Sequence, residues 1–223
     1  MRMDWHDLLF AHWPVNRETI QELIPSPLKV DVWDNQAWIA LVPFRMTDVA
    51  PRFVPAIPGL SDFPELNVRT YVTMNGKPGV WFFSLDATNR LAVRIARVAF
   101  HLPYMDARMS LRNEGEWYHY ASVRTHRNER PAEFRGRYRP EGEVFYAEPG
   151  SFEHWLTARY CLYASNSKGH VFRGEIDHPP WPLQAAEWVV EKNNYFEEFD
   201  VDMSFSPHLL FSERISVKAW LNQ

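Results

Sequence analysis

Polar side chains alternate along one short segment of the chain, residues 63–72. The polar positions are Glu65, Asn67, Arg69 and Tyr71, and the positions between them are Leu66, Val68, Thr70 and Val72. Side chains two residues apart in a β-strand point to the same side, so the segment predicts a strand with an acid, an amide, a guanidinium and a phenol on one face. Such a face could bind a small organic molecule and exchange a proton with it if it lines a cavity. If it meets solvent, the same residues form an ordinary exposed strand face, and the segment alone leaves both interpretations open.

Two further segments could form walls of a pocket. A turn that begins at His101 and ends at Tyr104 follows a predicted helix, and the proline-rich loop 178–182 contains Trp181. Proline restricts the backbone, so both segments are expected to be rigid. Loops whose side chains only pack against the sheet fit equally well. The candidate catalytic residues are Glu65 and Tyr104, and the candidate substrate contacts are Asn67, Arg69, Tyr71, His101 and Trp181.

The sequence contains none of the usual signatures of a metal or nucleotide site. It has nine histidines but no HxxxH or HExxH run, and these spacings are the ones that place two ligands on one helix face. It also lacks a glycine-rich phosphate loop. We therefore expect no metal and no cofactor. The single cysteine, Cys161, lies in the apolar run 160–163, which favours a buried structural thiol over a nucleophile.

Charge and composition narrow the class of protein. The net charge is −4 and the pI is about 6.1, so no global basic field draws the chain to nucleic acid. The arginine-rich segment 124–139 is interrupted by Glu129 and Glu133, which favours a solvated strand face over a nucleic-acid site. The segment 1–7 lacks the apolar core typical of a secretion signal, and no run of about 18 apolar residues occurs. With one cysteine, these features predict a cytoplasmic protein that contacts neither nucleic acid nor membrane.

The elements that must position the candidate residues are mostly strands. Helices are predicted at 17–24, 91–100 and 151–159. Residues 28–44 and 63–85 are predicted as two hairpins, the second turning at Asn75-Gly76, with an ordered proline-containing loop at 50–64. Further strands are predicted at 107–112, 117–126, 135–139, 160–164, 171–176, 203–205 and 214–220. A strand-rich chain of this length folds as a sandwich or a barrel, and we favour a closed or nearly closed, mostly antiparallel sheet around a pocket.

Several separate blocks of the chain resemble the YqjF-like family of uncharacterised proteins. The blocks are Phe10-Ala11-His12-Trp13, Leu41-Val42-Pro43-Phe44, Glu65-Leu66-Asn67-Val68-Arg69-Thr70-Tyr71, Phe83-Ser84-Leu85-Asp86-Ala87, Leu102-Pro103-Tyr104, Arg159-Tyr160-Cys161-Leu162-Tyr163 and Trp181-Pro182-Leu183-Gln184. That family is in turn similar to acetoacetate decarboxylase. The resemblance implies a single, mainly β domain over residues 1–223, folded as a cone-shaped, mostly antiparallel acetoacetate decarboxylase-like β-barrel around a largely apolar cavity. It also implies a homo-oligomer.

The resemblance raises the question of a catalytic lysine. Acetoacetate decarboxylase forms a Schiff base through a lysine that follows a proline beyond a helix, and a glutamate on an earlier strand lies in its cavity. The resemblance places Glu65 at the glutamate, Pro103 at the proline and Tyr104 where the lysine stands, and tyrosine cannot form an imine. Four of the five lysines lie in turns or polar runs, and Lys218 is expected to face outward on its strand. Schiff-base decarboxylation is therefore disfavoured.

Three hypotheses for the function remain. In the first, the cavity binds a small anionic organic acid or keto compound, with Arg69 on its carboxylate or enolate, Glu65 as acid or base, and Tyr104 as a donor to a carbonyl. Any turnover is then lyase, isomerase or hydratase chemistry without a lysine. In the second, the chain is a non-catalytic ligand-binding module in which Glu65 and Arg69 form a buried ion pair. In the third, it is a scaffold for oligomerisation. A pocket of a few hundred cubic ångströms between separated side chains would favour the first.

Overall fold

The computed structural model describes residues 1–50, 61–199 and 201–222, and the fold in these ranges is mostly β. Twelve strands belong to one sheet, and three short helices accompany them. The strands are β1 (Arg2–Val15), β2 (Lys29–Val30), β3 (Ala37–Ala50), β4 (Phe63–Met74), β5 (Lys77–Ala87), β6 (Tyr104–Glu114), β7 (Trp117–Arg124), β8 (Glu133–Phe145), β9 (Cys161–Ser165), β10 (Val171–Asp177), β11 (Leu183–Asn193) and β12 (His208–Asn222). The helices are α1 (Arg17–Leu23), α2 (Arg90–Phe100) and α3 (Phe152–Thr157).

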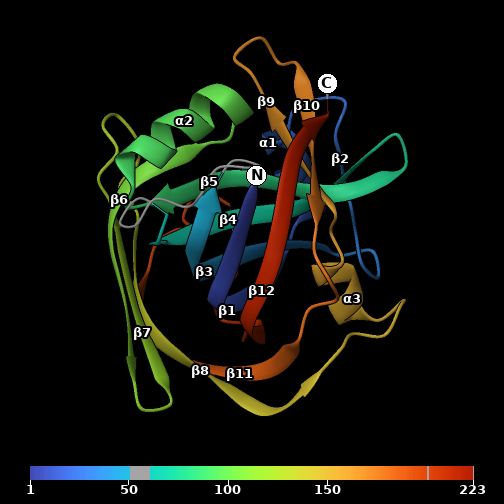
Figure 1. The fold of residues 1–223 in the computed structure, drawn as a ribbon. Helices are drawn as coiled ribbons and strands as arrows, with labels where there is room; N and C mark the ends of the chain where they lie inside the picture. Colours follow the sequence, from blue (N-terminus) through green and yellow to red (C-terminus); the bar gives the residue numbers. More distant parts are fainter. Residues whose placement is uncertain (51–60, 200, 223) are drawn as a thin grey trace.

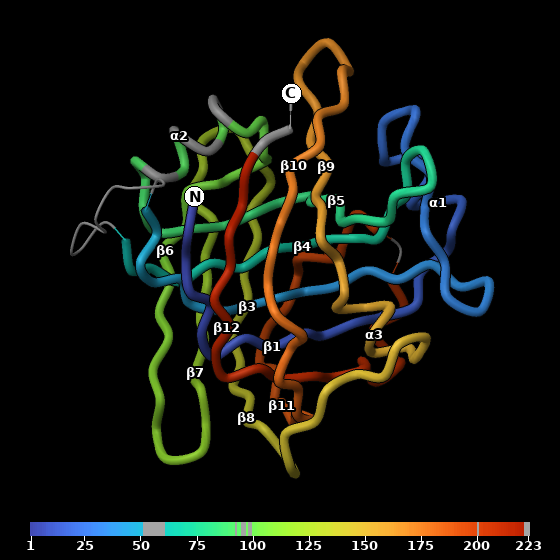
Figure 2. The backbone as a smooth tube through the Cα atoms, turned by 45° about the vertical axis from the view of Figure 1, so that its right-hand side comes forward, coloured from blue at the N-terminus to red at the C-terminus, as the bar shows by residue number. Residues whose placement is uncertain are grey.

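The strand pairings close the sheet into two rings that share one wall (Figure 1). The shared wall runs through β12, β1, β3, β4 and β5. A smaller ring closes it through β9 and β10, and a larger ring closes it through β6, β7, β8 and β11. Figure 2 shows β10 between β12 and β9. The pairings are antiparallel except for β5 with β6 and β5 with β9, so the predicted closed, mostly antiparallel sheet is confirmed.

The shared wall is buried on both faces because it separates two hydrophobic cores, one inside each ring. On β4, Leu66 and Val68 pack in the core of the larger ring, whereas Phe63 and Tyr71 pack in the core of the smaller ring. Alternation along β4 therefore separates two interiors, not an interior from solvent. The polar face of β4 consequently turns inward, where Glu65, Asn67 and Arg69 are all buried. This result decides the first question that the sequence left open.

Local sequence explains the helix starts and the central turn. The Asn16 side chain accepts a hydrogen bond of 2.9 Å from the Thr19 backbone N–H and caps α1, as asparagine does at many helix starts. Asn75 and Gly76 both have positive φ, 52° and 75°, which is the backbone that a two-residue β-hairpin turn requires. All three predicted helices are present. None of the helices in the described ranges is long and apolar enough to cross a bilayer.

Several predicted elements differ from the structure. The segment 28–44 is not a hairpin, because β2 pairs with β4 and β3 pairs with β1 and β4. Residues 203–205 form a turn, not a strand. Strands β1 and β11 were not predicted, and β1 contains an irregularity between His6 and Ala11 that interrupts its alternation. The predicted loop at 50–64 falls largely on residues 51–60, which lie outside the described ranges.

Candidate functional site

A cavity of about 90 Å³ lies inside the smaller ring. Its polar residues are Glu65, Asn67, Arg69 and Tyr104. Three of them come from alternate positions of β4, and Tyr104 is the first residue of β6. The other walls are largely apolar, with residues such as Met3, Phe82, Leu162, Ile176 and Val217. The cavity therefore has one polar wall, built by β4 and the start of β6, and apolar walls on its other sides.

Glu65 is the acid of this wall, and its carboxyl group is almost fully buried. The Tyr104 hydroxyl donates a hydrogen bond of 2.9 Å to Glu65 Oε2. Burial raises the pKa of Glu65 to about 8, although its hydrogen bonds with Tyr104 and Asn67 act in the opposite direction. At pH 7 the carboxyl group is therefore mostly protonated. The backbone carbonyl of Glu65 accepts a bond of 2.7 Å from the Tyr120 hydroxyl, which fixes this part of β4.

Arg69 is the cation of the wall, and only 8% of it is exposed. Its guanidinium group lies over the aromatic rings of Phe10 and Tyr71, at 5.1 and 5.8 Å from their centroids. Cation–π contacts of this kind hold the group in place without neutralising it. In the described part of the chain no carboxylate lies within 4.0 Å of it, and its buried Nε finds no hydrogen-bond partner among protein atoms. Arg69 thus keeps an unbalanced charge beside the cavity.

Glu65 and Arg69 do not form the buried ion pair that the second hypothesis required. Both residues line the same cavity, yet their contacts are separate: Tyr104 for the acid and aromatic rings for the cation. The cavity is smaller than the range of roughly 300–1,000 Å³ typical of drug-sized ligands. The separation agrees with the open site expected from the sequence, whereas the cavity of about 90 Å³ falls below the expected few hundred cubic ångströms and restricts that site to a small molecule.

The remaining candidates occupy three different surroundings. Tyr71 lies behind the lining, where its hydroxyl is 2.7 Å from the Nε2 of His12. Trp181 also lies behind the wall, where its ring stacks on Trp5 at 5.9 Å, and its Nε1 donates to the Thr157 carbonyl. His101 is exposed outside the cavity, where its imidazole stacks on the aromatic ring of Phe172. Tyr71 and Trp181 therefore back the wall, and the structure does not bring His101 to the site.

Two residues of the site escaped the sequence analysis because both lie on β1. Trp5 lines the cavity. His12 is fully buried beneath Tyr71, and burial, reinforced by Arg69, holds the pKa of His12 well below its usual value. The histidine is therefore neutral and adds no further positive charge next to Arg69. The sequence pointed to His12 only through the block Phe10-Ala11-His12-Trp13, which resembles the YqjF-like family.

Lysine and metal chemistry find no support at this cavity. All five lysines lie in the described ranges, and none lines the cavity. Lys77 is held by Glu175 at 2.6 Å, and Lys218 lies on the outside near Asp177. Within residues 1–50, 61–199 and 201–222, no three His, Cys, Asp or Glu side chains gather as metal ligands.

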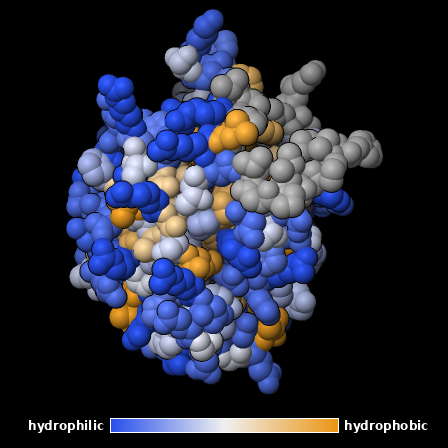
Figure 3. All heavy atoms as spheres, turned by 60° about the vertical axis from the view of Figure 1, so that its left-hand side comes forward, coloured by the Kyte–Doolittle hydropathy of each residue, from blue (hydrophilic) through white to orange (hydrophobic). Residues whose placement is uncertain are grey.

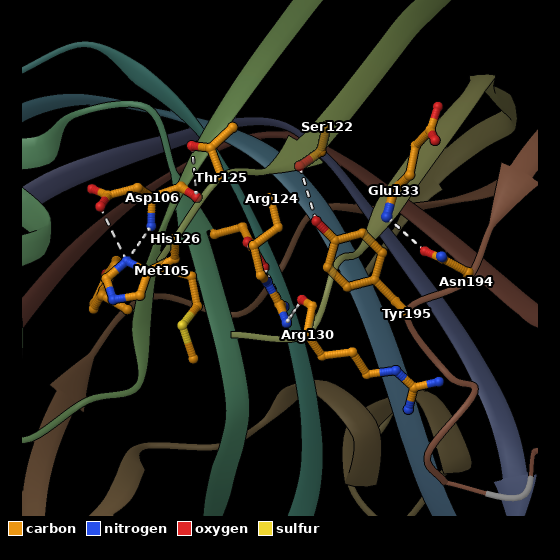
Figure 4. Close-up of polar contacts among 12 residues, drawn as sticks. Met105, Asp106, Ser122, Arg124, Thr125, His126, Arg130, Glu133, Asn194 and Tyr195 are labelled. Atoms are coloured by element: carbon orange, nitrogen blue, oxygen red, sulfur yellow. Dashed lines mark hydrogen bonds and ion pairs between the residues drawn. The ribbon is translucent and has the colours of Figure 1, made fainter. Parts of the chain in front are cut away.

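A second buried acid lies on the opposite face of the shared wall. Asp86 of β5 is fully buried, and Arg124 of β7 binds both of its oxygens, with distances of 2.8 and 2.7 Å. Figure 4 shows Arg124 next to Ser122 and Tyr195, whose hydroxyl groups are 3.0 Å apart. The Arg124 guanidinium also lies over the Tyr195 ring. This acid and its cation neutralise each other inside the larger ring.

The fold resembles that of acetoacetate decarboxylase-like proteins. Acetoacetate decarboxylase from Legionella pneumophila superimposes with a TM-score of 0.62 over 100% of this chain and 88% of its own, at 11% identity. An acetoacetate decarboxylase-like enzyme from Sphingomonas wittichii RW1 gives 0.63 over 100% and 93%, at 13% identity. The enduracididine biosynthesis enzyme MppR, complexed with pyruvate, gives 0.63 over 99% and 89%, at 8% identity. Identities this low establish a shared fold and nothing more.

Sequence comparison then fixes the family. Residues 2–216 match the model of the family DUF2071, described as "Uncharacterized conserved protein", and the chain belongs to that family. It is also 43% identical over 221 residues to the uncharacterized protein YqjF of Bacillus subtilis (strain 168), covering 99% of this chain and 90% of that protein. The resemblance inferred from the sequence blocks is therefore confirmed.

Proposed function

We propose that this protein binds a small organic carboxylate in the cavity lined by Glu65 and Arg69, and that Glu65 exchanges a proton with the bound molecule. One observation carries the proposal. A buried guanidinium without a carboxylate partner lines the same cavity as a buried carboxyl group without a cation. Buried charges in proteins are normally paired. A carboxylate from outside would balance Arg69 in the planar geometry that a guanidinium recognises.

The roles of Glu65 and Tyr104 follow from their protonation. Because the pKa of Glu65 is raised to about 8, a minority of its carboxyl groups is ionised at neutral pH. That carboxylate takes an α-proton from the bound acid and leaves an enolate, and the protonated carboxyl group returns a proton to the same carbon. The Tyr104 hydroxyl proton is engaged by Glu65, so Tyr104 positions the acid and is not free to donate to the ligand. Since no lysine lines the cavity, turnover would proceed through an enolate, as in an isomerase, lyase or hydratase. The fold neighbours support this reading by analogy, because one is named for a keto acid substrate and another was solved with pyruvate.

Binding and turnover are tested separately with two variants. Calorimetry with a panel of small carboxylic and keto acids should find a ligand that Arg69→Met binds roughly 10- to 100-fold more weakly, which is the value of a charge-assisted contact. Glu65→Gln keeps an uncharged group of the same shape, so it should bind like the wild type. It should nevertheless lose exchange of the ligand's α-protons with deuterated water, followed by NMR. Failure of every carboxylate to bind would refute the proposal.

A ligand-binding module without catalysis is the second candidate, and the observation that favours it is the small, largely apolar cavity. The exchange measurement separates the two candidates. A ligand that binds through Arg69 but shows no proton exchange, in either the wild type or Glu65→Gln, would identify a binding module.

Oligomerisation is a separate proposal that the resemblance suggests. Hydrophilic residues cover most of the face drawn in Figure 3, with smaller apolar areas among them. Large apolar side chains are also exposed, including Tyr146, Phe205 and Trp220. We propose that the protein is a homo-oligomer, and light scattering coupled to size-exclusion chromatography measures its mass directly. A mass of 26.3 kDa, that of one chain, would exclude it.

A further inference from the structure

Three residues that line the cavity carry a buried polar atom with no hydrogen-bond partner among the described residues. The atoms are Trp5 Nε1, Asn67 Oδ1 and Arg69 Nε. The first and third are donors, and the second is an acceptor. Unpaired buried polar atoms are uncommon in folded proteins. Their concentration around one cavity indicates that its occupant supplies the missing partners, namely two acceptors and one donor.

The two unpaired donors and the one unpaired acceptor distinguish between classes of organic acid as ligands. A simple keto acid offers only oxygen acceptors at neutral pH, because its carboxylate and its carbonyl carry no proton. It can satisfy Trp5 Nε1 and Arg69 Nε, but it leaves Asn67 Oδ1 without a donor. A hydroxyl group both donates and accepts. A hydroxy acid therefore meets all three demands with its own groups.

The orientation of Asn67 explains why its oxygen is the free end of the amide. The Asn67 side chain also hydrogen-bonds to Glu65, in a contact that favours the charged form of that acid. Oδ1 itself has no hydrogen-bond partner among the described residues, so it remains for the cavity. Asn67 is also the middle residue of the polar face of β4. Two residues along a strand span about 6.6 Å, so Asn67 lies between the acid end and the cation end of the wall.

We propose that the natural ligand is a small hydroxycarboxylate. Its carboxylate binds Arg69, its hydroxyl group donates to Asn67 Oδ1, and one of its oxygens accepts the hydrogen bond of Trp5 Nε1. The remaining carbon skeleton lies against the apolar walls, which Met3, Ile176 and Val217 help to form. This inference rests on the proposed carboxylate site and makes its ligand more specific.

Matched acids that differ only in oxidation state test the inference. The pairs are 2-hydroxybutyrate with 2-oxobutyrate and 3-hydroxybutyrate with acetoacetate, titrated calorimetrically into the full chain at pH 6, where Glu65 is protonated. The wild type should bind the hydroxy acid of at least one pair about tenfold more tightly, the value of one buried hydrogen bond. Asn67→Leu removes the acceptor at similar volume and should abolish this preference by weakening the hydroxy acid alone. Trp5→Phe keeps an aromatic ring and should weaken both members of the pair to the same extent.

The outcomes separate this inference from the proposed function. Equal binding within both pairs, or tighter binding of the oxo acids, would overturn the hydroxycarboxylate while leaving the carboxylate site in place. A hydroxy preference that survives in Asn67→Leu would also overturn it, because the acceptor would then lie elsewhere. If none of the four acids binds, the proposed carboxylate site itself fails. The wild-type comparison needs no variant, so it decides the inference even if Asn67→Leu does not fold.

Discussion

The two buried acids of the shared wall are neighbours in the sheet but have opposite surroundings. Glu65 on β4 pairs with Ala87, and the adjacent Leu66 pairs with Asp86 on β5. The two carboxyl groups therefore lie one register step apart on opposite faces. Arg124 donates hydrogen bonds from Nε and Nη2 to the two carboxylate oxygens of Asp86. The hydrogen-bonding groups at Glu65, from Tyr104 and Asn67, are uncharged. On the face of Glu65, no carboxylate of the described residues lies within 4.0 Å of the cation Arg69.

The contrast teaches how to distinguish a structural charge from a functional one when both are buried. In the larger ring, each charge compensates the other, and together with Tyr195 they fasten β5 to β7. In the smaller ring, burial raises the pKa of the acid, and no carboxylate of the described residues lies within 4.0 Å of the cation. A balanced pair needs nothing from outside the fold. An unbalanced cation at a cavity is stabilised by an anion that the fold does not supply.

The largest effect is expected from removing the cation of the balanced pair. Arg124→Met leaves the fully buried Asp86 without compensation, and such a loss typically lowers the free energy of unfolding by about 3–5 kcal/mol. Urea denaturation measures it. Arg69→Met is the matched control, since it removes a cation that has no acid partner, and it should change stability by less than about 1 kcal/mol. Equal destabilisation by the two variants would break the distinction between the two sites.

An effect of comparable total size, about 5 kcal/mol spread between pH 4.5 and pH 8, is expected in the pH dependence of stability. The folded protein holds a proton on Glu65 up to a pKa of about 8, whereas the unfolded chain releases it near the ordinary value of 4.5. The contribution of Glu65 is therefore complete below pH 4.5 and is lost as the pH rises toward 8, at up to about 1.4 kcal/mol per pH unit. Glu65→Gln lacks this dependence, so its stability relative to the wild type should rise across this window. Parallel curves for the two proteins would show that Glu65 is charged in the folded state.

The smallest effect is expected from the hydrogen bond that holds Glu65. Tyr104→Phe removes the hydroxyl donor while keeping the ring, which should lower the free energy of unfolding by about 1 kcal/mol. The Tyr104 bond favours the charged carboxylate, so its loss should also move the pKa of Glu65 further upward. Repeating the pH series on this variant should extend the sloping region above pH 8. An unchanged upper limit would show that Tyr104 does not control the acid.

The sequence revealed the polar wall because alternation within one strand is a local property. Glu65, Asn67 and Arg69 were placed on one face by their spacing, and Tyr104 was joined to them by the family resemblance. The burial of both faces of β4 was not predictable from its pattern, because it depends on two rings sharing one wall. Trp5 was missed because Asp7 has a positive φ of 53° and the pairing of β1 is irregular there, which disrupts the strand pattern.

His101 illustrates a limit of reasoning from neighbours in the sequence. It lies three residues before Tyr104, and two cavity-lining residues, Phe100 and Leu102, flank it. Its own backbone has a positive φ of 53°, and the side chain is exposed on the outside, stacked on Phe172. The left-handed backbone conformation of this one residue, at the end of α2, thus turns the His101 side chain away from the site. No spacing rule predicts such a reversal for a residue other than glycine.

A crystal structure of the protein with a bound acid tests the central claim most directly. The crystals would be grown with whichever of 2-hydroxybutyrate and 2-oxobutyrate binds more tightly in solution. The account predicts density for the acid inside the smaller ring, with its carboxylate within hydrogen-bonding distance of Arg69 Nε and the Asp86–Arg124 pair unchanged. A cavity that holds only water, with Arg69 turned to pair with a deprotonated Glu65, would contradict it.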